Sequence, residues 1–411
     1  MKPILQAALS LLLCLLFTLP VCADGTREAA TRLVTEYYSD DLTAQPDDAS
    51  VLAAAAPADF AALKAKSYVL MERETGRVLA AGHETEELAP ASITKIMSLL
   101  LVMEALDSGK LTLTQEVTCS EHAASMGGSQ IWLEPGETMT VDDLLKAVAV
   151  GSANDATVAL AEAVAGSEEA FVAEMNETAK ALGMANTHFV NCSGLDGEGQ
   201  FTSAVDIALM SRELLKHETV RNYTTIWMDS LRNGATQLVN TNKLVRFYDG
   251  ATGLKTGTTD QAGCCLAATA MRDGMELIAV VMGCPTSNDR FASAKALLNY
   301  GFAYYEYQTV PLALGEQSAL PVTHGTAQSV TLSLPESVRV LSERGKKDTK
   351  VNLRLPQTIE APVMAGEVLG RAEVTVGGET AVSVEIRAAD DVPDMTVGRA
   401  LLRVLQGLFH A

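Results

Sequence analysis

Ser92-Ile93-Thr94-Lys95 leads directly into an almost wholly apolar stretch from Ile96 to Leu106. A segment that is apolar on every side is typical of a helix buried in a protein core. Side chains three positions apart on a helix share a face, so Lys95 is within reach of the Ser92 hydroxyl. A lysine whose pKa is lowered by burial or by a nearby cation can take a serine proton, which makes Ser92 a candidate nucleophile.

Two further short motifs follow in chain order. Ser152-Ala153-Asn154 interrupts helix-like sequence, and Lys255-Thr256-Gly257 stands at the head of a predicted hairpin. A lysine there supplies positive charge for a substrate carboxylate, and a glycine lets a substrate backbone lie close to the strand. Ser-x-x-Lys is common on solvated helices and Ser-x-Asn is common as a helix cap. The three motifs together, in this order, indicate one site.

The surrounding pattern predicts an α/β domain over residues 63–305. Apolar runs on both sides of short Gly-containing turns predict two β-hairpins, over 68–80 and 264–282. Helices are expected where Ala, Leu, Glu and Lys dominate or where apolar residues run on. These helical stretches are 96–106, 142–164, 167–182 and 290–300.

Residues 306–390 have a different pattern of apolar and polar residues. Apolar and polar residues alternate there in short segments at regular spacing, a pattern that predicts a small all-β sandwich or barrel. The predicted strands are 330–334, 351–355, 373–376 and 382–386. We find no catalytic cluster in this region, so the chemistry is expected in the α/β domain.

The first 23 residues are expected to be a secretory signal peptide. Lys2 precedes an apolar run, and Val21-Cys22-Ala23 resembles a small-residue cleavage site. An uncleaved membrane anchor is the alternative, but the run falls short of the roughly 20 residues that span a bilayer. Residues 24–62 are acidic and Ala-rich and are expected to form a lead-in segment. The mature protein is therefore expected to act outside the cytoplasm.

Residues 391–411 are expected to form an amphipathic helix. From Val397 to His410 the polar residues recur at spacings of four, three and four, and apolar residues cover the rest of the surface. The segment is short for a bilayer crossing and carries two arginines. It fits a helix that lies on the membrane surface. A helix docked on the β domain or on a partner subunit is the alternative.

Composition excludes several classes of function. The 411 residues carry 51 acidic and 31 basic side chains, a net charge of −20, which disfavours nucleic-acid binding. Neither the scattered histidines nor the cysteines have metal-site spacing, so no metal is expected. Five cysteines remain after signal-peptide removal and are expected to be mostly buried thiols, with a disulfide between Cys264 and Cys284 as the less favoured alternative.

The three motifs resemble the set shared by class A β-lactamases and penicillin-binding proteins. The longer stretches Pro90 to Lys95, Asn191 to Asp206 and Gly253 to Gly263 resemble the low-molecular-mass penicillin-binding proteins, the serine D-alanyl-D-alanine carboxypeptidases. The resemblance covers about residues 67–301. It implies a transpeptidase-like α/β domain, then a β-rich domain and a terminal amphipathic helix.

Two positions depart from the usual family pattern. Ile93 stands where the family often has Thr, and Ala153 stands where it often has Gly. Neither position supplies a reacting group, so the implied chemistry is unaffected.

The resemblance implies a role for each motif residue. Ser92 is the nucleophile that attacks the carbonyl between two D-alanines, and Lys95 is the general base. Ser152 relays a proton to the leaving amine, and Asn154 orients Lys95 and the substrate amide.

The same resemblance implies that Lys255, Thr256, Gly257 and Thr258 hold the terminal carboxylate. The backbone N–H groups of Ser92 and Thr258 are expected to form the oxyanion hole. The implied partners are peptidoglycan stem peptides and β-lactam antibiotics. No cofactor is implied.

Two alternatives share these motifs. A class A β-lactamase deacylates through a Glu and a bound water, yet no carboxylate after Asn154 stands in a Glu-x-x-Leu-Asn setting. Nor does a β-lactamase need a β domain and a tail. A binding protein that keeps the fold without catalysis is the second alternative, although every motif residue is intact.

Overall fold

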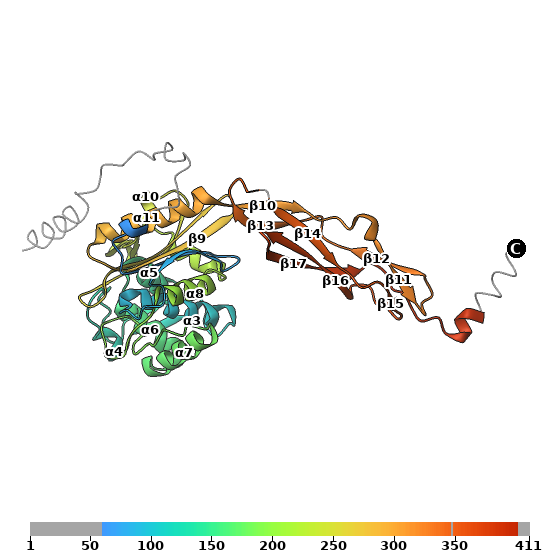
Figure 1. Ribbon diagram of the computed structural model, residues 1–411. Coiled ribbons are helices and arrows are strands. Elements are labelled where there is room, and N and C mark those ends of the chain that lie inside the picture. The colour runs from blue at the N-terminus through green and yellow to red at the C-terminus, as the bar shows by residue number, and fades with distance from the viewer. Residues whose placement is uncertain (1–59, 347, 402–411) are drawn as a thin grey trace, which may run out of the picture. The chain divides into compact units, whose positions relative to one another are not determined.

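The computed structural model describes residues 60–346 and 348–401. The predicted signal peptide, the lead-in segment as far as residue 59 and residues 402–411 of the predicted C-terminal helix lie outside the described residues. Along the chain, an α/β region comes first and an all-β region follows it (Figure 1). This order of mixed and all-β structure confirms the predicted fold class.

A five-stranded antiparallel sheet forms the centre of the α/β region, in the order β2-β1-β9-β8-β7. Its strands are β1 (Ser67–Glu72), β2 (Val78–Gly82), β7 (Ala251–Thr259), β8 (Gly263–Arg272) and β9 (Met275–Cys284). Both predicted hairpins are confirmed, as β1–β2 and β8–β9. Asp273 and Gly274, in the turn of the second hairpin, have φ of 49° and 74°, as a tight two-residue turn between twisted strands requires.

Helices cover both faces of this sheet (Figure 1). Along β9, Leu277, Ala279 and Val281 pack in one core with α11 (Ser287–Tyr304), and the residues between them pack in a second core with the other helices. A strand buried on both faces is apolar throughout, which explains its unbroken apolar sequence.

The second core contains the helix α3 (Lys95–Asp107), which is buried along almost its whole length as predicted. The helices around it are α5 (Val141–Gly151), α6 (Asn154–Ala165), α7 (Glu168–Ala181) and α8 (Ala204–Leu214). The shorter elements are α4 (Glu121–Ala124), α9 (Arg221–Thr224), α10 (Leu244–Phe247), β3 (Glu116–Thr118), β4 (Thr138–Thr140), β5 (Met228–Leu231) and β6 (Thr236–Val239).

The longer helices differ in how their first turns are capped. Helices α5, α7, α8 and α11 each begin after a Ser or Thr whose hydroxyl accepts a backbone N–H from the first turn. Helix α6 instead follows Ala153, which makes no such bond, and Ser152 before it has a left-handed φ of 61°. Ser152 thus ends α5 in a left-handed cap, and α6 begins without a side-chain cap.

The all-β region contains a six-stranded sheet, in the order β14-β16-β17-β12-β11-β15, and the pair β10–β13. The bounds are β10 (Tyr305–Pro311), β11 (Ala319–Thr323), β12 (Ser329–Ser333), β13 (Ser337–Glu343), β14 (Thr349–Arg354), β15 (Ile359–Glu360), β16 (Val368–Val376) and β17 (Glu379–Ala388). The four predicted strands correspond to β12, β14, β16 and β17. Val310 and Val340 pack against Val374, so the pair lies over the larger sheet.

The described part of the C-terminal segment ends in helix. Residues 397–401 are helical, and Val397 and Leu401 are 88% and 60% exposed. Within residues 60–346 and 348–401, none of the helices has both the length and the apolar character that a membrane crossing requires.

Candidate active site

Ser92 lies in a single 3₁₀ turn, Ala91–Thr94, that directly precedes α3. The prediction placed it at the start of the buried helix, whereas the first helical residue is Lys95. Ala91, Ile93 and Thr94 are buried, and Ser92 alone in the turn is partly accessible to solvent. The turn therefore presents one hydroxyl to solvent from an otherwise buried segment.

Lys95 is fully buried, and its ammonium has three hydrogen-bond acceptors. Nζ lies 3.0 Å from Ser92 Oγ, 2.6 Å from Asn154 Oδ1 and 2.6 Å from the Ser193 carbonyl oxygen. Burial lowers the pKa of Lys95 to about 7, since a low dielectric disfavours the charged form. Near neutral pH a large fraction of Lys95 is an amine that can accept the Ser92 proton.

Asn154 is held at both ends of its side-chain amide. Its Oδ1 accepts from Lys95, and its Nδ2 donates to the Gly127 carbonyl at 2.7 Å. The Asn154 backbone N–H also donates to the Ser129 carbonyl at 2.7 Å. These bonds fix which end of the amide faces Lys95.

Lys255 connects the second motif to the third. Its Nζ donates to Ser152 Oγ at 2.9 Å and to the Thr256 carbonyl at 3.1 Å. The lysine is buried, and this burial, with the nearby cations Lys95 and Arg290, holds its pKa well below the usual value. A substrate carboxylate would reverse this effect, because an adjacent anion favours the charged form.

The third motif lies on strand β7, which pairs with β8, and not at the head of the β8–β9 hairpin as expected. The expectation failed because glycines at 253 and 257 interrupt the apolar pattern of β7. Lys255 and Thr256 are buried, whereas Thr258 is exposed. The Thr256 hydroxyl donates to Thr241 Oγ1 at 2.6 Å.

Gly257 brings β7 against the turn that carries Ser92. A Cβ at this position would lie 3.0 Å from the Ser92 backbone nitrogen and 3.0 Å from the Ala91 Cβ. The sequence had assigned this glycine to the approach of a substrate backbone. The structure gives it a further reason, since any side chain here would push the strand away from the Ser92 N–H.

Several residues of the site carry no recognisable sequence motif. The Ser193 carbonyl takes one of the three Lys95 hydrogen bonds, and a Cβ on Gly194 would lie only 1.9 Å from the Ala91 carbonyl oxygen. Arg290, at the start of α11, donates to Gly257 O at 3.1 Å and to Thr258 Oγ1 at 2.8 Å. In the sequence, Ser193 and Gly194 were noted only as part of a stretch that resembles the family, and no role was assigned to them.

Asp155 is a further residue that the sequence did not single out. Its carboxylate is completely buried and accepts from the backbone N–H groups of Ile131, Leu133 and Ala156 at 2.8–3.1 Å. Since Asp155 directly follows Asn154, it ties the loop before β4 to the second motif. In the sequence, only its position next to Asn154 could have indicated that Asp155 belongs to the site.

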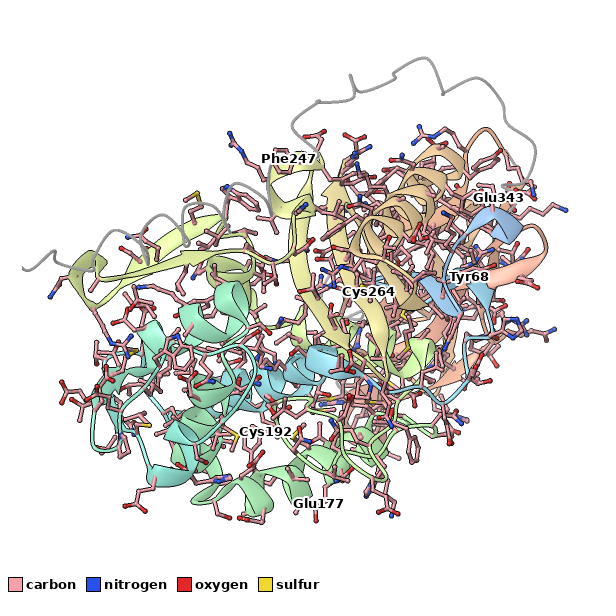
Figure 2. All side chains as sticks on the ribbon, turned by 90° about the vertical axis from the view of Figure 1, so that its left-hand side faces the viewer. Tyr68, Glu177, Cys192, Phe247, Cys264 and Glu343 are labelled. Atoms are coloured by element: carbon pink, nitrogen blue, oxygen red, sulfur yellow. The ribbon has the colours of Figure 1, made fainter. Side chains whose placement is uncertain are left out.

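The cysteines are free thiols in the part of the chain that the structure describes. Cys264 (labelled in Figure 2) and Cys284 are register partners on β8 and β9. The less favoured disulfide between them is absent, because both are free thiols. Burial raises the pKa of Cys284 to about 12. Among the described residues, no group of three or more His, Cys, Asp or Glu side chains could hold a metal ion.

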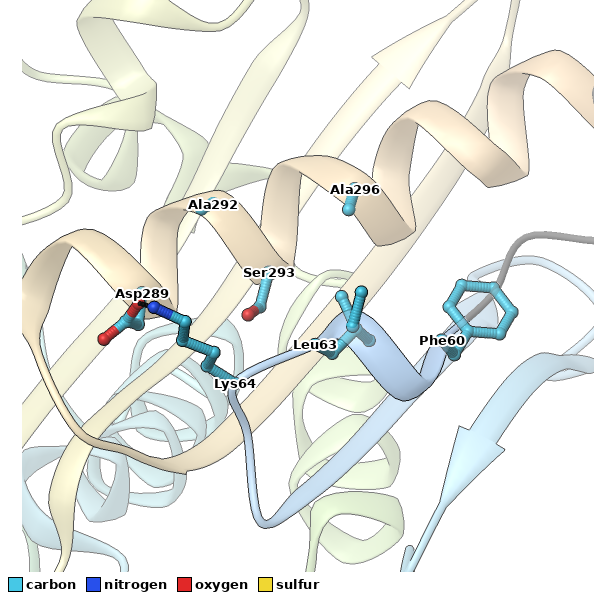
Figure 3. A pocket seen from close by; sticks show the side chains of 8 residues that line it. Phe60, Leu63, Lys64, Asp289, Ala292, Ser293 and Ala296 are labelled. Carbon is cyan, nitrogen blue, oxygen red and sulfur yellow. Dashed lines mark ion pairs between the residues drawn. The ribbon is translucent and has the colours of Figure 1, made fainter.

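A cavity of about 340 Å³ lies apart from these residues, alongside α11 (Figure 3). Its lining is mostly apolar and small, with one ion pair between Lys64 and Asp289 at 3.2 Å. None of the three motifs contributes to it. The candidate site is therefore defined by the converging hydrogen bonds around Lys95 and Lys255, and not by this cavity.

Comparison with known proteins gives the same family for both regions. Residues 51–286 match the family model described as D-alanyl-D-alanine carboxypeptidase, and residues 307–394 match that of the penicillin-binding protein 5 C-terminal domain. The D-alanyl-D-alanine carboxypeptidase DacF of Bacillus subtilis is 45% identical over 336 residues, which cover 80% of this chain and 86% of DacF.

Two solved structures are also similar. Penicillin-binding protein 5 from Haemophilus influenzae matches with a TM-score of 0.72 and 32% identity, over 83% of this chain and all of that one. Penicillin-binding protein D2 from Listeria monocytogenes, in an ampicillin-bound form, matches with a TM-score of 0.54 and 32% identity, over 59% of this chain and 98% of that one. The chain thus belongs to the D-alanyl-D-alanine carboxypeptidase family.

Proposed function

We propose that this protein is a serine-type D-Ala-D-Ala carboxypeptidase that removes the terminal D-alanine from peptidoglycan stem peptides through an acyl-enzyme on Ser92. One observation carries the proposal: a buried Lys95, with a pKa of about 7, lies 3.0 Å from the Ser92 hydroxyl. A general base works best when its pKa is close to the operating pH. Family membership supplies the substrate class.

Acylation begins with the neutral form of Lys95. Ser92 Oγ attacks the carbonyl carbon between the two D-alanines, and its proton moves to Lys95 Nζ. The oxyanion is stabilised by the backbone N–H groups of Ser92 and Thr258, which β7 and the 3₁₀ turn hold close together through Gly257. Two such donors are the usual requirement for acyl transfer.

The leaving amine needs a proton as the C–N bond breaks. Ser152 is suited to relay to it the proton that Lys95 took from Ser92, because its hydroxyl accepts a hydrogen bond from Lys255 and it lies two residues before Asn154, which contacts Lys95. Lys95 is then neutral again and can take a proton from the water that attacks the ester and return it to Ser92 Oγ. Free D-alanine departs, and water then attacks the ester on Ser92 to regenerate the enzyme. Each step uses groups of this chain and water alone.

Lys255, Thr256 and Thr258 bind the terminal carboxylate of the substrate in this proposal. The strand β7 carries all three, and Arg290 adds a second cation beside Thr258. A C-terminal carboxylate is thus selected by charge, which favours a carboxypeptidase over cleavage within a chain. The test is to incubate the enzyme with a pentapeptide ending in D-Ala-D-Ala and to measure released D-alanine. Release of D-alanine from the pentapeptide and no release of D-alaninamide from its C-terminal amide supports the proposal, and equal release of the two products contradicts it.

The β-lactamase alternative depends on a free carboxylate that activates water after acylation. Glu162 accepts from Ser120 Oγ, and Glu168 accepts from the Cys192 N–H and pairs with His122, so both have structural partners. A penicilloyl group on Ser92 is therefore expected to outlast the peptide acyl group by a wide margin. Penicillin turnover at rates typical of a β-lactamase would favour the alternative.

We also propose that the protein is exported and acts at the outer face of the cytoplasmic membrane in cell-wall maturation. The signal-peptide pattern of residues 1–23 and the peptidoglycan chemistry of the family support export. The amphipathic pattern of residues 391–411 supports contact with the membrane surface. N-terminal sequencing of the exported protein tests the first point, with Asp24 as the expected first residue.

A further inference from the structure

Trp132 is the most exposed large apolar side chain among the described residues of the α/β region, at 74%. Its two neighbours are buried: Ile131 is 2% exposed and Leu133 is 5% exposed. The backbone at Trp132 has a φ of 60°, in the left-handed region that bulky side chains rarely adopt. The indole is thus turned outward between two residues that face the core.

The loop that carries Trp132 is fixed to the second motif. The N–H groups on either side of Trp132, from Ile131 and Leu133, donate to the buried carboxylate of Asp155. Earlier in the same loop, the carbonyls of Gly127 and Ser129 accept from the side chain and the backbone of Asn154. Because Asn154 contacts Lys95, this loop lies within two hydrogen bonds of the general base.

Arg232 fixes the loop from the opposite side. Its guanidinium donates to the Ile131 carbonyl at 2.8 Å and makes two bonds to the Glu137 carboxylate, at 2.7 and 3.0 Å. The backbone around Trp132 is therefore held by a buried carboxylate and by an arginine, while the side chain itself is left in water. Strained backbone clusters at active sites and ligand clamps, and tryptophan is enriched at binding interfaces.

We propose that Trp132 is a specificity-determining contact for the stem peptide, and that its indole packs against the aliphatic part of the residue that precedes D-Ala-D-Ala. The inference rests on the proposed function and names the part of the substrate that Lys255 does not bind. The proposed carboxylate contacts lie on β7, whereas the Trp132 loop is hydrogen-bonded to Asn154, the residue assigned to Lys95 and the substrate amide. An indole face suits aliphatic and amide groups, since it buries much apolar area with little loss of side-chain freedom.

The first test compares long and short substrates. Trp132→Ala is expected to lower kcat/KM about tenfold for an L-Ala-D-Glu-L-Lys-D-Ala-D-Ala pentapeptide. It is expected to leave N-acetyl-D-Ala-D-Ala cleavage and benzylpenicillin acylation within about twofold of wild type. Trp132→Phe is expected to restore most of the pentapeptide activity. Met364→Ala, which removes another exposed apolar side chain in the all-β region, is the matched control and is expected to change none of the three.

Three results would overturn this inference. A pentapeptide kcat/KM that is unchanged in Trp132→Ala would show that Trp132 does not contact this substrate productively. Equal losses on the pentapeptide, the short substrate and penicillin would assign Trp132 a structural role in the loop. A loss that appears only when the pentapeptide carries its disaccharide would place the sugar, and not the peptide, on the indole. If the wild-type enzyme releases no D-alanine from any of these peptides, the proposed function itself is wrong, whereas the three results above contradict only the Trp132 contact.

The second test detects binding directly. The chain has two tryptophans, and Trp227 packs edge to face with Phe247, with ring centroids 5.7 Å apart. In a Ser92→Ala, Trp227→Phe variant, Trp132 is the single fluorophore and the peptide is not turned over. A saturable emission change is expected with the D-Ala-D-Ala pentapeptide and none with the same peptide ending in L-Ala-L-Ala. Emission that stays constant well above the wild-type KM would contradict the contact.

Discussion

The side-chain oxygen of Asn154 accepts a buried 2.6 Å hydrogen bond from Lys95 Nζ, across 59 positions of sequence. The opposite end of the same amide donates to the Gly127 carbonyl. Asn154 therefore contacts Lys95, the proposed general base, and anchors a loop at the same time. A single side chain couples the chemistry at Ser92 to the backbone that surrounds the site.

Two replacements of Asn154 test its effect on Lys95. Asn154→Ala leaves Lys95 without one acceptor and should lower the rate of penicillin acylation by about a hundredfold or more, on the scale of losing an oriented polar group in an active site. Asn154→Asp places an anion beside Lys95 and should raise the pKa of the lysine. Acylation rates measured against pH decide the second point. A profile for Asn154→Asp that coincides with wild type would contradict it.

The acylation rate of the wild-type enzyme is expected to rise with pH and to level off above about 7, the pKa of Lys95. Below that pKa Lys95 is protonated and cannot accept the Ser92 proton, so the rate should fall about tenfold for each pH unit. Stopped-flow acylation by a chromogenic cephalosporin gives this profile. Lys95→Arg, which keeps the charge and cannot act as a base near neutral pH, should be inactive at every pH. A profile that stays flat through the neutral range would exclude Lys95 as the base.

Gly257→Ala tests the close approach of β7 to the Ser92 turn. The new Cβ would meet the Ser92 nitrogen at 3.0 Å, so the strand must shift by a few tenths of an ångström. Loss of alignment in the oxyanion hole is expected to reduce acylation by about ten- to a hundredfold. Gly398→Ala is the control, since no atom of the described residues lies within 4 Å of the added methyl group. Equal acylation rates for both variants would show that the approach has no catalytic role.

The C-terminal segment is expected to hold the mature enzyme on the membrane. Deletion of every residue after Asp394 removes the exposed helical start at Val397 and Leu401 and all that follows it. The truncated enzyme should move to the soluble fraction and keep its D-Ala-D-Ala carboxypeptidase activity. Cell fractionation followed by labelling with fluorescent penicillin measures both. Full retention on the membrane would assign the attachment to another part of the chain.

The sequence was sufficient to predict the parts of the fold that have a strong local pattern. The two hairpins and the buried helix α3 follow from apolar runs bounded by turn residues. Strand β7 was missed as a separate strand because glycines at 253 and 257 interrupt its pattern. Strands β10, β11, β13 and β15 were missed because they are short or lie at sheet edges, where the pairing partner decides the structure.

In the candidate site, too, the residues with a local sequence pattern were predicted and the others were missed. The three motifs carry residue types with a recognisable spacing, and the structure brings their side chains into two hydrogen-bonded sets, Ser92–Lys95–Asn154 and Lys255–Ser152, which adjoin through the second motif. The Ser193 carbonyl and the Gly194 approach have no such signal, because a backbone atom can come from any residue type. Arg290 was missed because it reaches β7 from α11, more than 30 positions further along the chain. Contacts of this kind depend on the completed fold.

The central claim is that Ser92 forms the acyl-enzyme, and intact-mass spectrometry of the protein after penicillin treatment tests it most directly. The wild-type mass should increase by one drug molecule, and peptide mapping should place the adduct on Ser92. Ser92→Ala should remain at its starting mass under the same conditions. Stoichiometric labelling that persists in Ser92→Ala would contradict the account.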